Sequence, residues 1–103
     1  MYPATPGSHF NWNYYLGQHL ELSRRLLKPR GLLRIEIDKG IAGLPPGASP
    51  PYHAVGHLFF RTIAELESAL AATAAEFIAD ERNYFDGGSV VQISEVVESQ
   101  LLA

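Results

Sequence analysis

The amino-acid sequence predicts a single α+β domain in which two helices cover one face of an antiparallel sheet. Its 103 residues are one domain's worth of chain, so residues 1–103 are taken as one unit. The apolar pattern runs in the order helix, strand, strand, helix, strand. A hydrophobic content of 47% with 18% charged residues is typical of a chain that folds around a core.

The first helix is predicted over residues 12–27. Asn11 can cap its N-terminus, and Pro29 with Gly31 ends it. The residues that recur at helical spacing form one face, and they are Trp12, Tyr15, Leu16, His19, Leu20, Leu22, Leu26 and Leu27.

Two strands are predicted next, over residues 32–38 and 52–60, with a loop rich in proline and glycine over residues 40–51 between them. The first strand alternates apolar and charged residues, which indicates one exposed face. The second is apolar on both faces, although two helices can cover only one face of the sheet. We therefore expect a second copy of the chain to cover the other face, as a homodimer.

The second helix begins at a capping box, Thr62 to Glu65, and is predicted to run to about Ala79. A loop with the pair Gly87-Gly88 follows over residues 80–88, and a last strand is predicted over residues 89–97.

Charge, cysteine content and segment lengths exclude several classes of function. A net charge of −3 supplies no basic surface for nucleic acid, so none is expected as a partner. The chain has no cysteine, and His53 and His57, about 13 Å apart along a strand, cannot share one metal ion, so we expect no metal site. No apolar stretch approaches the ~20 residues that span a bilayer, and no secretory signal is visible, which predicts no membrane contact and a cytoplasmic location.

Several short motifs together resemble the EthD family, named for ethyl tert-butyl ether degradation. They are Tyr2-Pro3 with Pro6-Gly7, Phe10 to Leu16 with His19, Gly40 before the proline-rich loop, Ala54 to Phe60, Ala79-Asp80 with Asn83-Tyr84, and Val91 to Glu95. The resemblance implies a dimeric α+β barrel of ferredoxin-like subunits, a small-molecule pocket between helices and sheet, and no cofactor. It also implies a first strand ahead of Tyr2, which this chain lacks, and we hypothesise a start site set too late or a truncated gene.

His19 and His57 are the candidate catalytic residues. Tyr15 and His19 are four residues apart on one helix face, a geometry that suits a proton relay, although a core histidine bonded to a carbonyl or water has the same pattern. His57 is expected at an interior strand position beside Gly56, as a general base or a substrate contact, or alternatively as an interface histidine between subunits.

Candidate substrate-binding residues are Tyr15, Tyr84, Phe59, Asp80 and Trp12, because aromatic side chains with a few polar tips furnish apolar cavities as well as cores. Asp80 follows a helix C-terminus, where the macrodipole disfavours a carboxylate. It can bond the backbone of the turn at residues 82–84, or it can hold a pocket histidine in one tautomer.

These residues predict a homodimer that binds a hydrophobic or aromatic metabolite. The expected chemistry is proton transfer without a cofactor, in an isomerisation, cyclisation or decarboxylation. The alternative is a non-enzymatic accessory protein that carries an intermediate of an oxidative degradation pathway.

Overall fold

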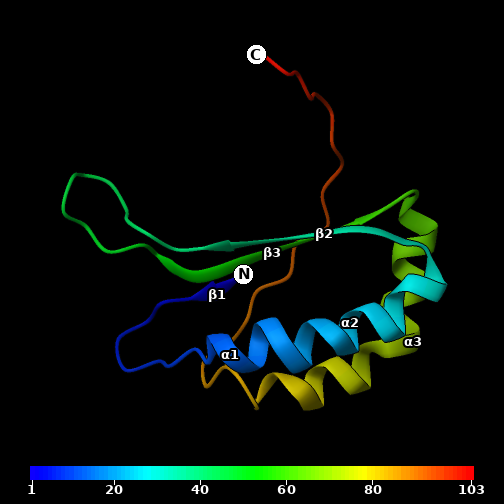
Figure 1. The fold of residues 1–103 in the computed structure, drawn as a ribbon, viewed down its shortest axis with the longest axis horizontal. Helices are drawn as coiled ribbons and strands as arrows, with labels where there is room; N and C mark the ends of the chain where they lie inside the picture. The colour runs from blue at the N-terminus through cyan, green and yellow to red at the C-terminus, as the bar shows by residue number, and fades with distance from the viewer.

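The computed structural model describes all of residues 1–103 and confirms the predicted α+β fold. Its elements in chain order are β1 (Tyr2–Pro3), α1 (Trp12–Tyr14), the π-helical segment η1 (Tyr15–His19), α2 (Leu20–Leu27), the short 3-10 helix η2 (Lys28–Arg30), β2 (Leu32–Lys39), β3 (Tyr52–Phe60) and α3 (Ile63–Glu81). Helices lie on one side of the sheet, and the opposite face carries none (Figure 1).

The sheet is antiparallel, with strand order β1-β3-β2. In the β2–β3 register, Ile37 pairs with Gly56 and Glu36 pairs with His57. Because side chains alternate along a strand, the first pair faces the helices and the second faces away from them. The register therefore assigns Gly56 and His57 to opposite faces of the sheet.

Local capping fixes both helix starts. The Asn11 side chain accepts a hydrogen bond from the Tyr14 backbone N–H, and the Thr62 hydroxyl accepts one from the Glu65 N–H. Gly31, with a φ of 102°, provides the left-handed turn that ends the first helical stretch. The second helix ends at Glu81, two residues beyond the predicted end. Neither helical stretch has a segment long and apolar enough to cross a membrane.

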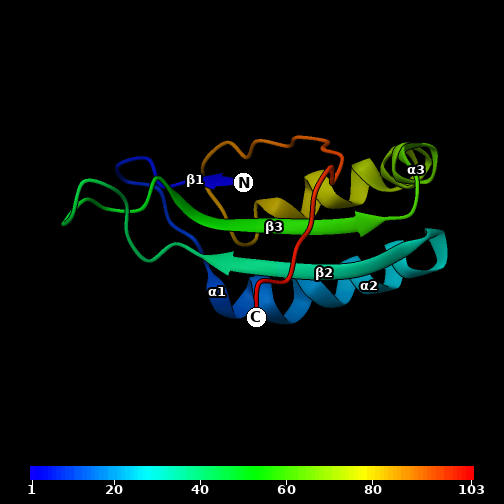
Figure 2. The ribbon, with the colours of Figure 1, turned by 90° about the horizontal axis from the view of Figure 1, so that it is seen from above.

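The predicted last strand over residues 89–97 is wrong. Only Val90 pairs with another segment: the Met1 ammonium donates to the Val90 carbonyl at 2.8 Å, and the Val90 N–H donates to the Met1 carbonyl at 2.9 Å. Beyond Val90 the chain leaves the sheet on the side opposite the helices (Figures 1 and 2). The reason is that β1 is only two residues long, so residues 91–97 have no neighbouring strand to bond.

At the N-terminus the strand β1 is formed by Tyr2–Pro3 alone. These residues pair antiparallel with the beginning of β3, where Tyr2 lies opposite Ala54. The remainder of β3, residues 55–60, pairs only with β2. β3 is thus a central strand at one end and an edge strand at the other.

Candidate functional site

An aromatic cluster fills the space between the helices and the β1 end of the sheet. Tyr15, Tyr84 and Phe85 are its buried members, with 2%, 4% and 3% of their surfaces exposed. Partly buried side chains pack around them, namely Tyr2, Phe10, Trp12, Tyr14 and Ile37. Ring centroids of Tyr15 and Tyr84 lie 5.0 Å apart in an edge-to-face arrangement. Aromatic pairs in such geometries hold one another in place, so the polar atoms on this cluster have fixed positions.

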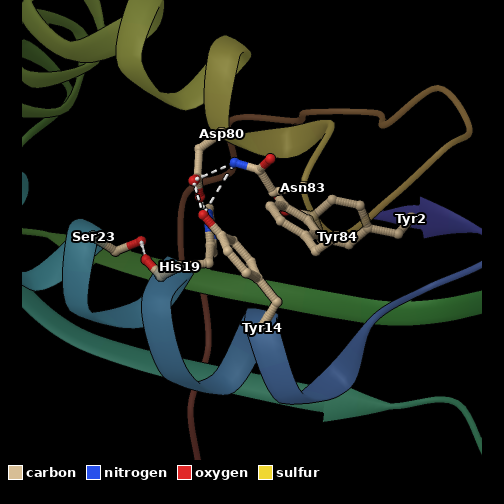
Figure 3. A network of polar contacts seen from close by, with 7 residues as sticks. All are labelled: Tyr2, Tyr14, His19, Ser23, Asp80, Asn83 and Tyr84. Atoms are coloured by element: carbon tan, nitrogen blue, oxygen red, sulfur yellow. Dashed lines mark hydrogen bonds and ion pairs between the residues drawn. The ribbon is translucent and has the colours of Figure 1, made fainter.

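His19 lies at the edge of this cluster and is paired with Asp80. Its Nδ1 is 2.9 Å from Asp80 Oδ2, and both side chains are largely buried (Figure 3). The imidazole stacks on the Tyr15 ring, with centroids 4.9 Å apart and planes 14° apart. Because a carboxylate only accepts hydrogen bonds, Nδ1 carries the proton and Nε2 presents its lone pair. The structure thus brings together three of the predicted residues as a histidine base, a carboxylate and a phenol.

The π-helical segment η1 sets how the Tyr15 and His19 side chains are oriented toward each other. The Leu20 N–H donates to the carbonyl of Tyr15, five residues back, in addition to that of Gly17. A π-helical turn is wider than an α-helical turn and is found frequently at functional sites. Here it sets the Tyr15 and His19 rings face to face on the side of the helix that is buried.

The environment keeps the pair as a neutral imidazole beside a carboxylate. Burial lowers the pKa of His19, and the hydrogen bond that His19 donates to Asp80 offsets this only in part. Burial opposes ionisation of Asp80, but hydrogen bonds from Tyr14, His19 and Asn83 outweigh it and hold the pKa of Asp80 below its usual value. At neutral pH His19 is therefore available as a base.

The tyrosines around the pair remain protonated and can act as donors. Burial raises the pKa of Tyr15 and of Tyr84 above the ordinary range of a phenol. Burial also raises the pKa of Tyr2, whose hydroxyl lies 2.8 Å from that of Tyr84. The site thus combines one base with phenols that donate hydrogen bonds.

One atom of the site, His19 Nε2, has no hydrogen-bond partner in the protein. No buried side-chain nitrogen or oxygen lacks a partner, so Nε2 contacts solvent, although His19 is only 7% exposed. The Tyr15 hydroxyl interacts with that of Tyr2. The site thus presents the nitrogen of a neutral imidazole, with a phenol on the ring stacked against it.

Gly56 makes room for the Tyr15 phenol. A β-carbon at this position would lie 2.9 Å from Tyr15 Oη, closer than such contacts allow. The absent side chain on β3 therefore fixes how deeply Tyr15 enters between helix and sheet.

Substitution Gly56→Ala is expected to displace the Tyr15 ring and to lower thermal stability by several degrees, since overpacking costs about 1–3 kcal/mol. Differential scanning calorimetry measures the change. Gly17→Ala is the matched control, because a β-carbon there meets nothing within 4 Å. An unchanged Tm in Gly56→Ala would show that Tyr15 does not depend on this space.

Acidification is expected to destabilise the fold through this site. Because the pKa of His19 is lowered on folding, the unfolded chain takes up a proton at a higher pH than the folded protein does. The stability that the neutral form of His19 contributes is complete above about pH 6.5, the pKa of histidine in the unfolded chain. It is lost as the pH falls through the lower pKa of His19 in the folded protein. Asp80, whose pKa is also lowered, acts in the same direction below about pH 4.

The measurement is the Tm between pH 7.5 and 5. We expect the Tm of the wild-type protein to fall over this range and that of His19→Asn to fall less steeply. A Tm that stays constant or rises on acidification would contradict a lowered pKa of His19.

His57 and Phe59 lie apart from this site, on the sheet face without helices. His57 Nε2 is 3.0 Å from Asp38 Oδ2, and the Arg34 guanidinium lies over the Phe59 ring at 4.8 Å. The two histidines predicted as acid and base are thus separated by the sheet. Trp12, predicted as a substrate contact, packs at the edge of the aromatic cluster, 5.9 Å from Tyr15.

Tyr2, Tyr14 and Asn83 belong to the site, although none of them was a predicted site residue. The Tyr14 hydroxyl donates to Asp80 Oδ1 at 2.5 Å, and the Asn83 amide donates to the same oxygen at 3.3 Å. The available signal was the carboxylate at a helix C-terminus, which needs donors to compensate it. Asn83, three residues after Asp80, is within reach for that role.

A hollow of about 460 Å³ opens on the outer side of the helices, and Asp80 and Tyr14 line it. The remaining lining residues come from the first helical stretch: Gly17, Gln18, Glu21, Leu22 and Arg25. The carboxylate of the pair is thus reached from this side as well. No three histidine or acidic side chains come together in a way that could hold a metal ion.

Comparison with known proteins agrees with this architecture. The model of the EthD domain matches residues 9–88. The crystal structure of an EthD-like protein from Ralstonia eutropha JMP134 is similar, with a TM-score of 0.88 and 32% sequence identity over 97% of this chain and 89% of that one. Among curated proteins no match was found. The chain is therefore a member of the EthD family.

Proposed function

We propose that this protein binds a hydrophobic or aromatic small molecule and moves a proton on it at His19 Nε2, without a cofactor. The observation that carries the proposal is that His19 Nε2, on an otherwise buried ring stacked on Tyr15, has no partner in the protein, while Nδ1 is held by Asp80. A buried, neutral histidine oriented by a carboxylate is suited to act as a general base.

The chemistry follows from the free nitrogen and the neighbouring phenol. His19 Nε2 takes a proton from the carbon next to a carbonyl group, which leaves an enolate, and Asp80 stabilises the imidazolium that results. The Tyr15 hydroxyl donates a hydrogen bond to the oxygen that gains negative charge. Return of the proton from Nε2 to another carbon completes an isomerisation. In a cyclisation the enolate carbon attacks an internal carbonyl, and the alkoxide formed takes the proton from Nε2. In the decarboxylation of a β-keto acid, Nε2 takes the carboxyl proton, loss of carbon dioxide leaves the enolate, and Nε2 returns the proton to its carbon.

Deuterium exchange tests the proposal. The probe is 2-tetralone, an aromatic ketone with acidic hydrogens beside its carbonyl, observed by proton NMR in D₂O with wild-type protein and with His19→Gln. We expect the wild type to accelerate exchange and His19→Gln to lose the acceleration while still binding, as saturation-transfer NMR reports. Binding by the wild type without exchange would overturn catalysis and favour the accessory carrier.

We also propose that the chain works as a homodimer that covers the open face of the sheet. No helix covers this face, and its charges are already paired, His57 with Asp38 and Arg34 with Glu36. Pairing lowers the cost of burying charges at an interface. Native mass spectrometry tests this: twice the chain mass supports the proposal, and a monomer at micromolar concentration contradicts it.

A further inference from the structure

Asp80 uses its two carboxylate oxygens for different partners. Oδ2 accepts the proton of His19 Nδ1, whereas Oδ1 accepts from the hydroxyl of Tyr14 and from the amide of Asn83. The Asn83 amide also donates to the Tyr14 hydroxyl oxygen, at 3.1 Å. Tyr14, Asp80 and Asn83 thus form a closed triangle of hydrogen bonds beside the histidine (Figure 3).

The triangle joins three segments of the chain. Tyr14 is the last residue of α1, Asp80 is in the last turn of α3, and Asn83 follows in the turn beyond it. The Tyr14 ring is itself held, because it stacks on Tyr84 with centroids 6.2 Å apart and planes 18° apart. The position of the hydroxyl is therefore set by packing as well as by its hydrogen bonds.

We propose that Tyr14 is a positioning residue for the His19–Asp80 pair, which acts by fixing one carboxylate oxygen and drawing part of the negative charge away from the imidazole. The inference rests on the proposed function, to which it adds a residue that acts through Asp80. A hydrogen bond to one carboxylate oxygen weakens the other oxygen as an acceptor, since both share one charge. Tyr14 thereby limits how strongly Asp80 stabilises the protonated imidazolium form of His19.

The groups that face His19 define what else could change its protonation. Asp80 and Glu81 of α3 lie near it, Tyr84 beyond α3 is 4.6 Å from it between ring centroids, and Tyr15 stacks on it. Tyr14 influences His19 through Asp80. Removing only the Tyr14 hydroxyl therefore isolates this one effect.

The experiment is an NMR titration of His19 without substrate, in protein labelled at histidine and assigned with His19→Gln. In Tyr14→Phe, Asp80 offers more charge to the imidazolium, so we expect the pKa of His19 to rise and the acid limb of kcat/KM to move to higher pH. Asn83→Ala is expected to give a smaller rise. Tyr52→Phe, the same substitution on β3 outside the network, should give none.

An unchanged or lower pKa of His19 in Tyr14→Phe would overturn the inference, even if the variant loses stability. If Tyr14→Phe fails to fold, the exposed Asn83→Ala decides the question by the same criterion. The result is separable from the proposed function. A rise in pKa with no ketone exchange by the wild type supports positioning and refutes the chemistry, whereas exchange with an unchanged titration in Tyr14→Phe does the reverse.

Discussion

Replacement of Asp80 with asparagine is expected to lower the rate of ketone deuterium exchange by about 10³- to 10⁴-fold, with ligand affinity little changed. Tyr14 and Asn83 both donate to Oδ1, so the new amide oxygen stays with them and the amide NH₂ faces His19 Nδ1. Nδ1 then accepts a hydrogen bond and the ring proton moves to Nε2, which removes the free base.

The measurement combines exchange rates with nitrogen chemical shifts of the imidazole, which report the tautomer. Asp38→Asn is the matched control, because Asp38 pairs with His57 at 3.0 Å on the other face of the sheet. It should leave exchange at the wild-type rate. If Asp80→Asn exchanges as fast as the wild type, Asp80 does not orient the base.

Substitution Leu27→Ala is expected to lower the free energy of unfolding by about 2–5 kcal/mol. Leu27 has no exposed surface and is one of only nine buried residues. Because the core is small, the loss of one core side chain is a large part of a typical free energy of unfolding of about 5–15 kcal/mol. Urea denaturation at fixed protein concentration gives the value. Leu16→Ala, at a site 52% exposed in the same helical stretch, should cost less than about 1 kcal/mol. Equal losses in the two variants would mean that Leu27 is not part of the core.

Helices and the two long strands follow from local signals in the sequence. Asn11 and Thr62 cap their helices through their own side chains, and the alternation of residues 32–38 depends only on which face is buried. Residues 89–97 carry an equally good strand pattern but remain without a strand, because a strand needs a partner and only Val90 finds one, in Met1 just ahead of β1. The alternation pattern of one segment does not show whether another part of the chain supplies a neighbouring strand.

The candidate site was also predictable only where its contacts are local in the sequence. Tyr15 and His19 are neighbours at a spacing of four, and a histidine partner was one of the two alternatives for Asp80 at the helix end. Tyr14 escaped prediction because its contact with Asp80 spans 66 residues of chain. His57 was expected with His19, yet strand register puts it on the far face, and register depends on pairing between segments.

The π-helical segment makes the geometry of the candidate site depend on the number of residues in this helical stretch. Each residue of an α-helix turns the chain by about 100°. Deleting one residue within Tyr15–His19 would restore ordinary α-helical bonding, but it would rotate Trp12, Tyr14 and Tyr15 by about that angle relative to His19. We therefore expect point substitutions on the exposed side of this turn to be tolerated better than insertions or deletions. A relative with an alignment gap here would place the histidine differently from the aromatic rings.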